Sequence, residues 1–125
     1  MSIHSLLMRF SAVGGPSNLF PSFVLNNPGA YGDNFGHSVA ISNNYFIVGA
    51  PYANGAGSDS GKAYIFDVTT GSVLHTLNNP NTYGTAATDY FGYSVAINGN
   101  RVLVGAYGED DAGGVDSGKA YIYPF

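Results

Sequence analysis

The chain has 125 residues, a net charge of −4 and only four cationic side chains, so it lacks the basic stripe that a nucleic-acid binder needs. Charged residues make up 10% of it, against roughly 25% in an average soluble domain, while 45% of it is apolar, which excludes disorder caused by excess charge. The absence of cysteine excludes disulfides and thiol chemistry, and no apolar run approaches the ~18 residues that would insert into a bilayer.

Residues 1–21 are predicted to form an N-terminal arm without a Sec signal, because the apolar patch before Arg9 is only three residues long. Residues 22–125 are predicted to form one unit. Its first segment, residues 22–28, aligns with residues 74–80, since Leu-Asn-Asn-Pro occurs in both. Residues 22–28 are therefore expected to be equivalent to a strand that appears later in the chain.

The rest of the unit is an internal repeat. Residues 33–50 align with residues 89–106, and 11 of these 18 positions are identical. Alternating small and β-branched residues predict half-buried strands, whereas the nearly continuous apolar runs 45–48 and 101–104 predict strands buried on both faces. Turns rich in Asn and Gly separate these strands, and no helical periodicity occurs. The expected strands are 38–41, 45–48, 63–66 and 72–77 in the first repeat, and 94–97, 101–104 and 120–123 in the second.

Two motifs recur in the same order in both repeats. Phe35-Gly-His-Ser-Val-Ala precedes Val48-Gly-Ala-Pro51, and Phe91-Gly-Tyr-Ser-Val-Ala precedes Val104-Gly-Ala-Tyr107. They resemble the FG-GAP repeats of integrin α-subunit β-propellers, over about residues 22–125. The resemblance implies an all-β fold of two four-stranded propeller blades per chain, in which the motif residues are structural. It also implies an acidic calcium loop between the motifs, but the turns 42–44 and 98–100 contain no carboxylate.

The order of the strands predicts an oligomer. The chain begins with an equivalent of a fourth strand and ends on a third strand, and two blades cannot close a ring because propellers have about four to eight. The sequence therefore predicts a homotrimer with six blades, and a tetramer with eight is the alternative. The predicted strand exchange pairs one subunit with the next through Phe23, Val24, Leu25, Tyr121 and Ile122.

No motif in the chain predicts catalysis. Residues 113–119 resemble the start of a phosphate-binding loop, but Ala120 replaces the required Ser or Thr and a strand follows instead of a helix. The histidines at 4, 37 and 75 have no neighbouring carboxylate or histidine at a metal-binding spacing, so they are expected to pack or to face solvent. The chain is thus predicted not to be an enzyme.

One loop concentrates negative charge. It contains Glu109, Asp110, Asp111 and Asp116 in a chain that is otherwise poor in charge. Two interpretations remain, a solvated acidic loop or a Ca²⁺ site, because Ca²⁺ takes six to eight oxygen ligands and suits flexible loops. No cofactor is expected to be required for folding.

Two functions fit these features. The first is a structural or adhesive module on a virion or another extracellular surface, such as a head decoration, fibre or tail protein that leaves the host by lysis. Its expected partners are its own copies and virion or cell-surface proteins or glycans, without nucleic acid or membrane insertion. The second is a carbohydrate-binding lectin assembled as an oligomeric propeller, in which tyrosines would stack on sugars because the chain has no Trp.

Overall fold

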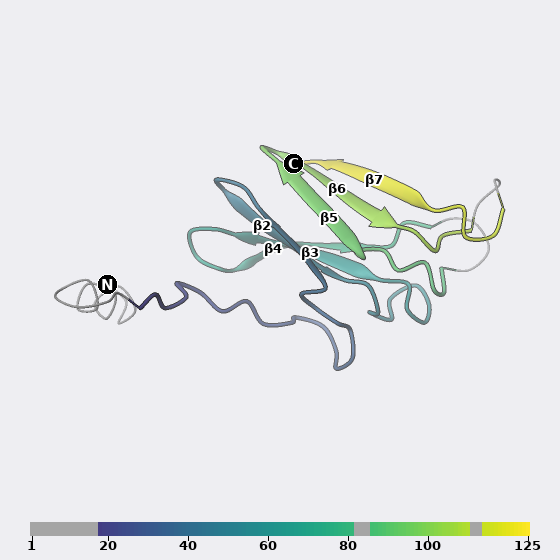
Figure 1. Ribbon diagram of the computed structural model, residues 1–125, viewed down its shortest axis with the longest axis horizontal. Coiled ribbons are helices and arrows are strands. Elements are labelled where there is room, and N and C mark those ends of the chain that lie inside the picture. The colour runs from purple at the N-terminus through teal and green to yellow at the C-terminus, as the bar shows by residue number, and fades with distance from the viewer. Residues whose placement is uncertain (1–17, 82–85, 111–113) are drawn as a thin grey trace.

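The computed structural model describes residues 18–81, 86–110 and 114–125 as two antiparallel sheets without helices (Figure 1). The first sheet has four strands in the order β1-β2-β3-β4, and the second has three in the order β5-β6-β7. Because the described residues form no helix, none of them forms a helix that could cross a membrane. The strands are β1 (Ser38–Ile41), β2 (Tyr45–Ala50), β3 (Lys62–Asp67), β4 (Val73–Asn78), β5 (Ser94–Asn98), β6 (Arg101–Ala106) and β7 (Lys119–Pro124).

The two repeats have the same register. Ser38 pairs with Gly49 in the first sheet, and Ser94 pairs with Gly105 in the second. The third strand of each repeat continues this pattern, since β2 pairs with β3 and β6 pairs with β7. The predicted repeat of strands and turns is therefore confirmed, and the second sheet ends at three strands within the described residues.

The main core lies between the two sheets. Because successive side chains of a strand point to opposite faces, alternate residues of the first sheet face the second. Ile47 and Ile65 of the first sheet, Val102 and Val104 of the second, and Phe91 before β5 are at most 1% exposed. Burying each of these side chains contributes about 1.5–3 kcal/mol, so this interface holds the two sheets together.

The opposite face of the first sheet carries a second apolar cluster. Val48, Tyr64 and Phe66 are buried there, with Leu25 and Phe35 packed against them. Leu25 belongs to the segment before β1, which runs along the side of the first sheet that faces away from β5–β7 (Figure 1). Residues 22–28 form no strand within the single chain, although they lie beside one.

The predicted burial of the second strands is half right. In the predicted run 45–48, Ile47 and Val48 are buried on opposite faces of β2, while Tyr45 and Phe46 are half-buried. In β6, however, exposed and buried residues alternate, and Leu103 is 43% exposed. The prediction for 101–104 is wrong because no described residue covers the face of the second sheet that points away from the first.

A glycine allows the two sheets to approach closely. A Cβ atom on Gly49 would overlap the carbonyl oxygen of Gly92, which belongs to the backbone before β5. We expect Gly49→Ala to push the sheets apart and to lower the free energy of unfolding by about 1–3 kcal/mol. Gly55→Ala is the matched control, because its Cβ would meet only side chains, the flexible Lys62 at 3.1 Å and the hydroxyl of Ser60 at 3.7 Å. Denaturant unfolding of both variants tests this, and equal midpoints would contradict it.

Candidate functional site

The loops at one end of the two sheets meet because of the hairpin register. The segment before β1 lies beside the loop after β2, where the backbone N–H of Tyr52 donates to the carbonyl of Asp33 at 3.1 Å. The same bond recurs in the second repeat, from Gly108 to Asp89 at 3.1 Å. Each repeat therefore places its two motif loops side by side at this end.

Aromatic rings from these loops form a contiguous group, which we call the tyrosine cluster. Tyr107 is at its centre, stacked on Tyr90 with ring centroids 5.4 Å apart and packed edge-on against Tyr93 at 4.6 Å. Tyr52 contacts Tyr90 at 5.5 Å, and His37 contacts Tyr93 at 4.2 Å. The cluster therefore spans both repeats.

The cluster is open to solvent. Tyr107 is 55% exposed and Tyr93 is 37% exposed, whereas the neighbouring Phe91 is completely buried. His37, also exposed, has its Nδ1 atom 3.2 Å from the carbonyl oxygen of Tyr93. The sequence prediction that His37 packs or faces solvent is confirmed, since it does both.

The phenol at the centre of the cluster is neutral at pH 7. Desolvation, followed by the neighbouring hydroxyls of Tyr93 and Tyr90, raises the pKa of Tyr107 above its ordinary value. A neutral tyrosine presents an apolar ring face together with a hydroxyl that both donates and accepts hydrogen bonds. Such a surface can bind a partner by stacking and hydrogen bonding.

Glu109, part of the predicted acidic site, is buried inside the second repeat. It is 0% exposed, and its two carboxylate oxygens lie 2.8 and 2.6 Å from the hydroxyl of Tyr121, which donates to it. The ammonium of Lys119 lies 3.5 Å from the same carboxylate. Glu109 is the equivalent of Ala53 in the first repeat. The backbone carbonyl of Glu109 accepts a 2.9 Å hydrogen bond from the glycine before β7, and the carbonyl of Ala53 accepts a 2.9 Å hydrogen bond from the glycine before β3. The carboxylate of Glu109 therefore interacts with side chains of its own repeat and not with solvent.

The other predicted calcium ligands are only partly brought together. Asp110 accepts a 2.6 Å hydrogen bond from the backbone N–H of Asp116, and the two residues lie in the same loop. Asp111 lies outside the described residues, and among those described no three acidic or histidine side chains gather as a metal site. A Ca²⁺ site and a solvated acidic loop therefore stay the two interpretations of this loop.

Sequence reasoning missed the tyrosine cluster because its rings come from separate loops. A signal was present, since Tyr52, Tyr90, Tyr93 and Tyr107 each lie within or directly beside a repeated motif. Residues beside motifs that recur at one end of a sheet are brought together by the fold.

The contact between Tyr121 and Glu109 provides a test of internal packing. We expect Tyr121→Phe to lower the free energy of unfolding at pH 7 by about 1–3 kcal/mol, because the buried carboxylate loses its hydroxyl donor. Tyr123→Phe is the matched control: its hydroxyl is buried without a hydrogen-bond partner in the described part of the chain. Its removal should cost little, so equal losses in the two variants would refute this account.

The same tyrosine predicts a pH dependence. Burial, and then the hydrogen bond to Glu109, raises the pKa of Tyr121 above its ordinary value. The folded state therefore holds this proton more tightly than the unfolded chain, so the stabilisation is complete below about pH 10 and is lost above it. Urea unfolding from pH 8 to 11 should show a steeper fall for the unaltered chain than for Tyr121→Phe.

Comparison with known proteins agrees with the repeated architecture. A family model for the FG-GAP repeat matches residues 25–66 and 83–123, one match for each sheet. A comparison with curated proteins gives no significant match. The matched residues include both copies of the two motifs, the strands β1, β2, β5 and β6, all but the last residue of β3 and of β7, and the rings of the tyrosine cluster. The chain therefore belongs to the FG-GAP repeat family.

Proposed function

We propose that the chain is a non-enzymatic adhesive module, a β-propeller unit on the surface of a virion or another extracellular particle. The observation that carries this proposal is the exposed tyrosine cluster, which joins the loops of both repeats at one end of the sheets. Its groups are aromatic rings and hydroxyls, which suit binding. The extracellular setting is supported by the resemblance to repeats that work outside cells.

The buried carboxylates support a role without catalysis. Asp33 accepts from the backbone N–H of Ala30 at 2.8 Å, and Asp89 accepts from the amides of Asn79 and Asn81 at 2.8 and 2.7 Å. Like Glu109, each is engaged by groups of the chain itself. These hydrogen bonds give the three buried carboxylates a structural role, holding the loop residues beside them in place.

We further propose that the module works as a ring of identical copies. Three copies would provide six blades, and four copies would provide eight, both within the usual range for propellers. A ring would repeat the tyrosine cluster once per copy on the same end. Multivalent binding of this kind raises avidity for a repetitive surface without any new contact.

The ring predicts a mass. Light scattering of the purified chain should give three times the 13.0 kDa of a single chain. Four times that mass would indicate the tetramer. A stable species with the mass of one chain would refute assembly into a ring.

The second candidate is a carbohydrate-binding lectin, which the tyrosine cluster specifically favours. Aromatic rings stack on the apolar faces of sugars, and their hydroxyls can hydrogen-bond to the ring substituents. Tyr107 has its stacked neighbour Tyr90 on one side and is half exposed, which leaves ring surface for a ligand.

A glycan array separates the two candidates. If the chain is a lectin, it should bind a defined class of glycans, and Tyr107→Ala should weaken this binding at least tenfold because it removes the central ring. Tyr31→Ala is the matched control, since Tyr31 is fully exposed and makes none of the cluster's ring contacts. A silent array favours the structural adhesive module, and a gene neighbourhood with capsid or tail genes would support the virion setting.

A further inference from the structure

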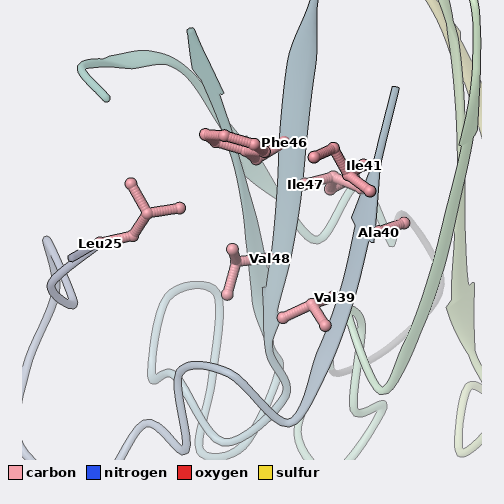
Figure 2. Close-up of a pocket in the computed structure, with 7 residues that line it drawn as sticks. All are labelled: Leu25, Val39, Ala40, Ile41, Phe46, Ile47 and Val48. Carbon is pink, nitrogen blue, oxygen red and sulfur yellow. The ribbon is translucent and has the colours of Figure 1, made fainter. Parts of the chain in front are cut away.

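Each sheet has one apolar face that no other sheet covers. On the first sheet, Val39 and Ile41 are both 67% exposed, and they line a pocket of about 240 Å³ together with Phe46, Val48 and Leu25 (Figure 2). We call the face that carries Val39, Ile41, Phe46 and Val48 the outer face of the first sheet. The outer face of the second sheet consists of Ala96, Leu103, Ala120 and Ile122.

The second of these faces repeats a surface that is buried in the same chain. Through the repeat, Leu103 and Ile122 correspond to Ile47 and Ile65. Ile47 and Ile65 are at most 1% exposed because they face the second sheet in the core, whereas Leu103 and Ile122 are 43% and 65% exposed. The outer face of the second sheet thus has the apolar residues of a face that is buried in the first sheet.

The outer face of the first sheet repeats the opposite half of the same core. Val39, Ile41, Phe46 and Val48 correspond in order to the residues that the second sheet directs at the first, namely Val95, Ile97, Val102 and Val104. The two uncovered faces are therefore equivalent to the two halves of the interface that the chain already forms between its own sheets. They are complementary to each other.

We propose that the outer face of the first sheet binds the outer face of the second sheet of another copy, head to tail, and that residues 22–28 supply the fourth strand of that second sheet. The proposal rests on the ring proposed above and identifies its contact surfaces. A head-to-tail contact between identical chains gives a closed ring when the rotation from one chain to the next is a whole fraction of a full turn.

The position of Leu25 supports the donated strand. Leu25 packs on the outer face of the first sheet, in the cluster with Phe46 and Val48. Its repeat equivalent, Leu77 in β4, packs into the core that contains Val102 and Val104, the equivalents of Phe46 and Val48. Leu25 therefore already occupies the place of a fourth-strand leucine from a preceding blade.

The turn after the donated segment has the geometry of the turn after β4. The side-chain oxygen of Asn27 accepts from the N–H of Gly29 at 2.8 Å, and that of Asn79 accepts from the N–H of Asn81 at 2.9 Å. Asn79 also donates to the carbonyl of Ser60, at 3.0 Å. The equivalent acceptor for Asn27 in the ring is the carbonyl of Ser117 in the next copy.

The donated strand would also cover an edge. Among the described residues β7 pairs only with β6, and an unpaired edge promotes aggregation. In the first sheet Ala63 pairs with Leu77, so the repeat sets the register between copies. Ala120 should face Leu25, and Ile122 should face Phe23.

Two variants test the head-to-tail contact. Val39→Asp and Ile122→Asp each place a charge at a position that is exposed in the single chain, so both should fold, but each buries the charge if the faces meet. Each variant alone should be a monomer with the 13.0 kDa mass of one chain. Their equimolar mixture should give a dimer of twice that mass, because one intact face of each kind remains.

The outcomes separate this inference from the ring itself. If the unaltered chain assembles but either variant alone still assembles, or the mixture gives no dimer, the ring stands and the head-to-tail contact is wrong. A monomeric unaltered chain overturns both. Circular dichroism of each variant verifies that it has kept its strands.

An engineered disulfide tests the donated strand. Because the chain has no native cysteine, only the introduced cysteines can cross-link. A mixture of the single variants Leu25→Cys and Ala120→Cys should form a covalent dimer, because directly paired residues lie within disulfide range. The control mixture, Leu25→Cys with Ile122→Cys, is two residues out of register and should not cross-link efficiently. Equal cross-linking of both mixtures, or none, would refute the register.

Discussion

Everything else in this fold depends on the packing of one sheet face against another. Ile47 and Ile65 meet Val102 and Val104 across the interface, and all four are at most 1% exposed. Because side chains alternate along a strand, a repeat with an apolar residue at nearly every position has two apolar faces. Among the described residues the two sheets bury one face each against the other, and part of the opposite face stays exposed on both, with Val39 and Ile41 on the first sheet and Leu103 and Ile122 on the second. This constraint links the sequence of a strand directly to assembly.

Buried polar groups hold described parts of the loops in place. Asp89 accepts hydrogen bonds from two asparagine amides and Glu109 accepts one from the hydroxyl of Tyr121, so the described residues beside Tyr90 and Tyr107 are held by hydrogen bonds. A fixed loop presents its exposed rings without a large loss of conformational entropy on binding. Tyr90 and Tyr107, stacked at the end of these loops, therefore form a preorganised surface rather than two mobile side chains.

The strands and the family could be predicted from the sequence because alternation and repetition are local signals. Which faces of a strand are covered could not be predicted. The run 101–104 has the same sequence whether one or both of its faces are covered by other elements, and Leu103 is exposed. Glu109 looked like a possible metal ligand because its partner Tyr121 is twelve residues away and only the fold brings them together. The tyrosine cluster escaped prediction for the same reason, since no spacing along the chain connects Tyr52 with Tyr90.

The differences between the two repeats divide their tasks. Their strands are nearly interchangeable, but the loop after β6 has Tyr107 where the first repeat has Pro51, and Glu109 where it has Ala53. Tyr107 is the centre of the tyrosine cluster, and the buried carboxylate of Glu109 accepts the hydroxyl of Tyr121. In the proposed ring of identical copies the two kinds of loop would alternate, so the cluster would recur once per chain rather than once per blade. Similar strands keep the two sheets equivalent in register, whereas the loops are where the two repeats differ in exposed chemistry.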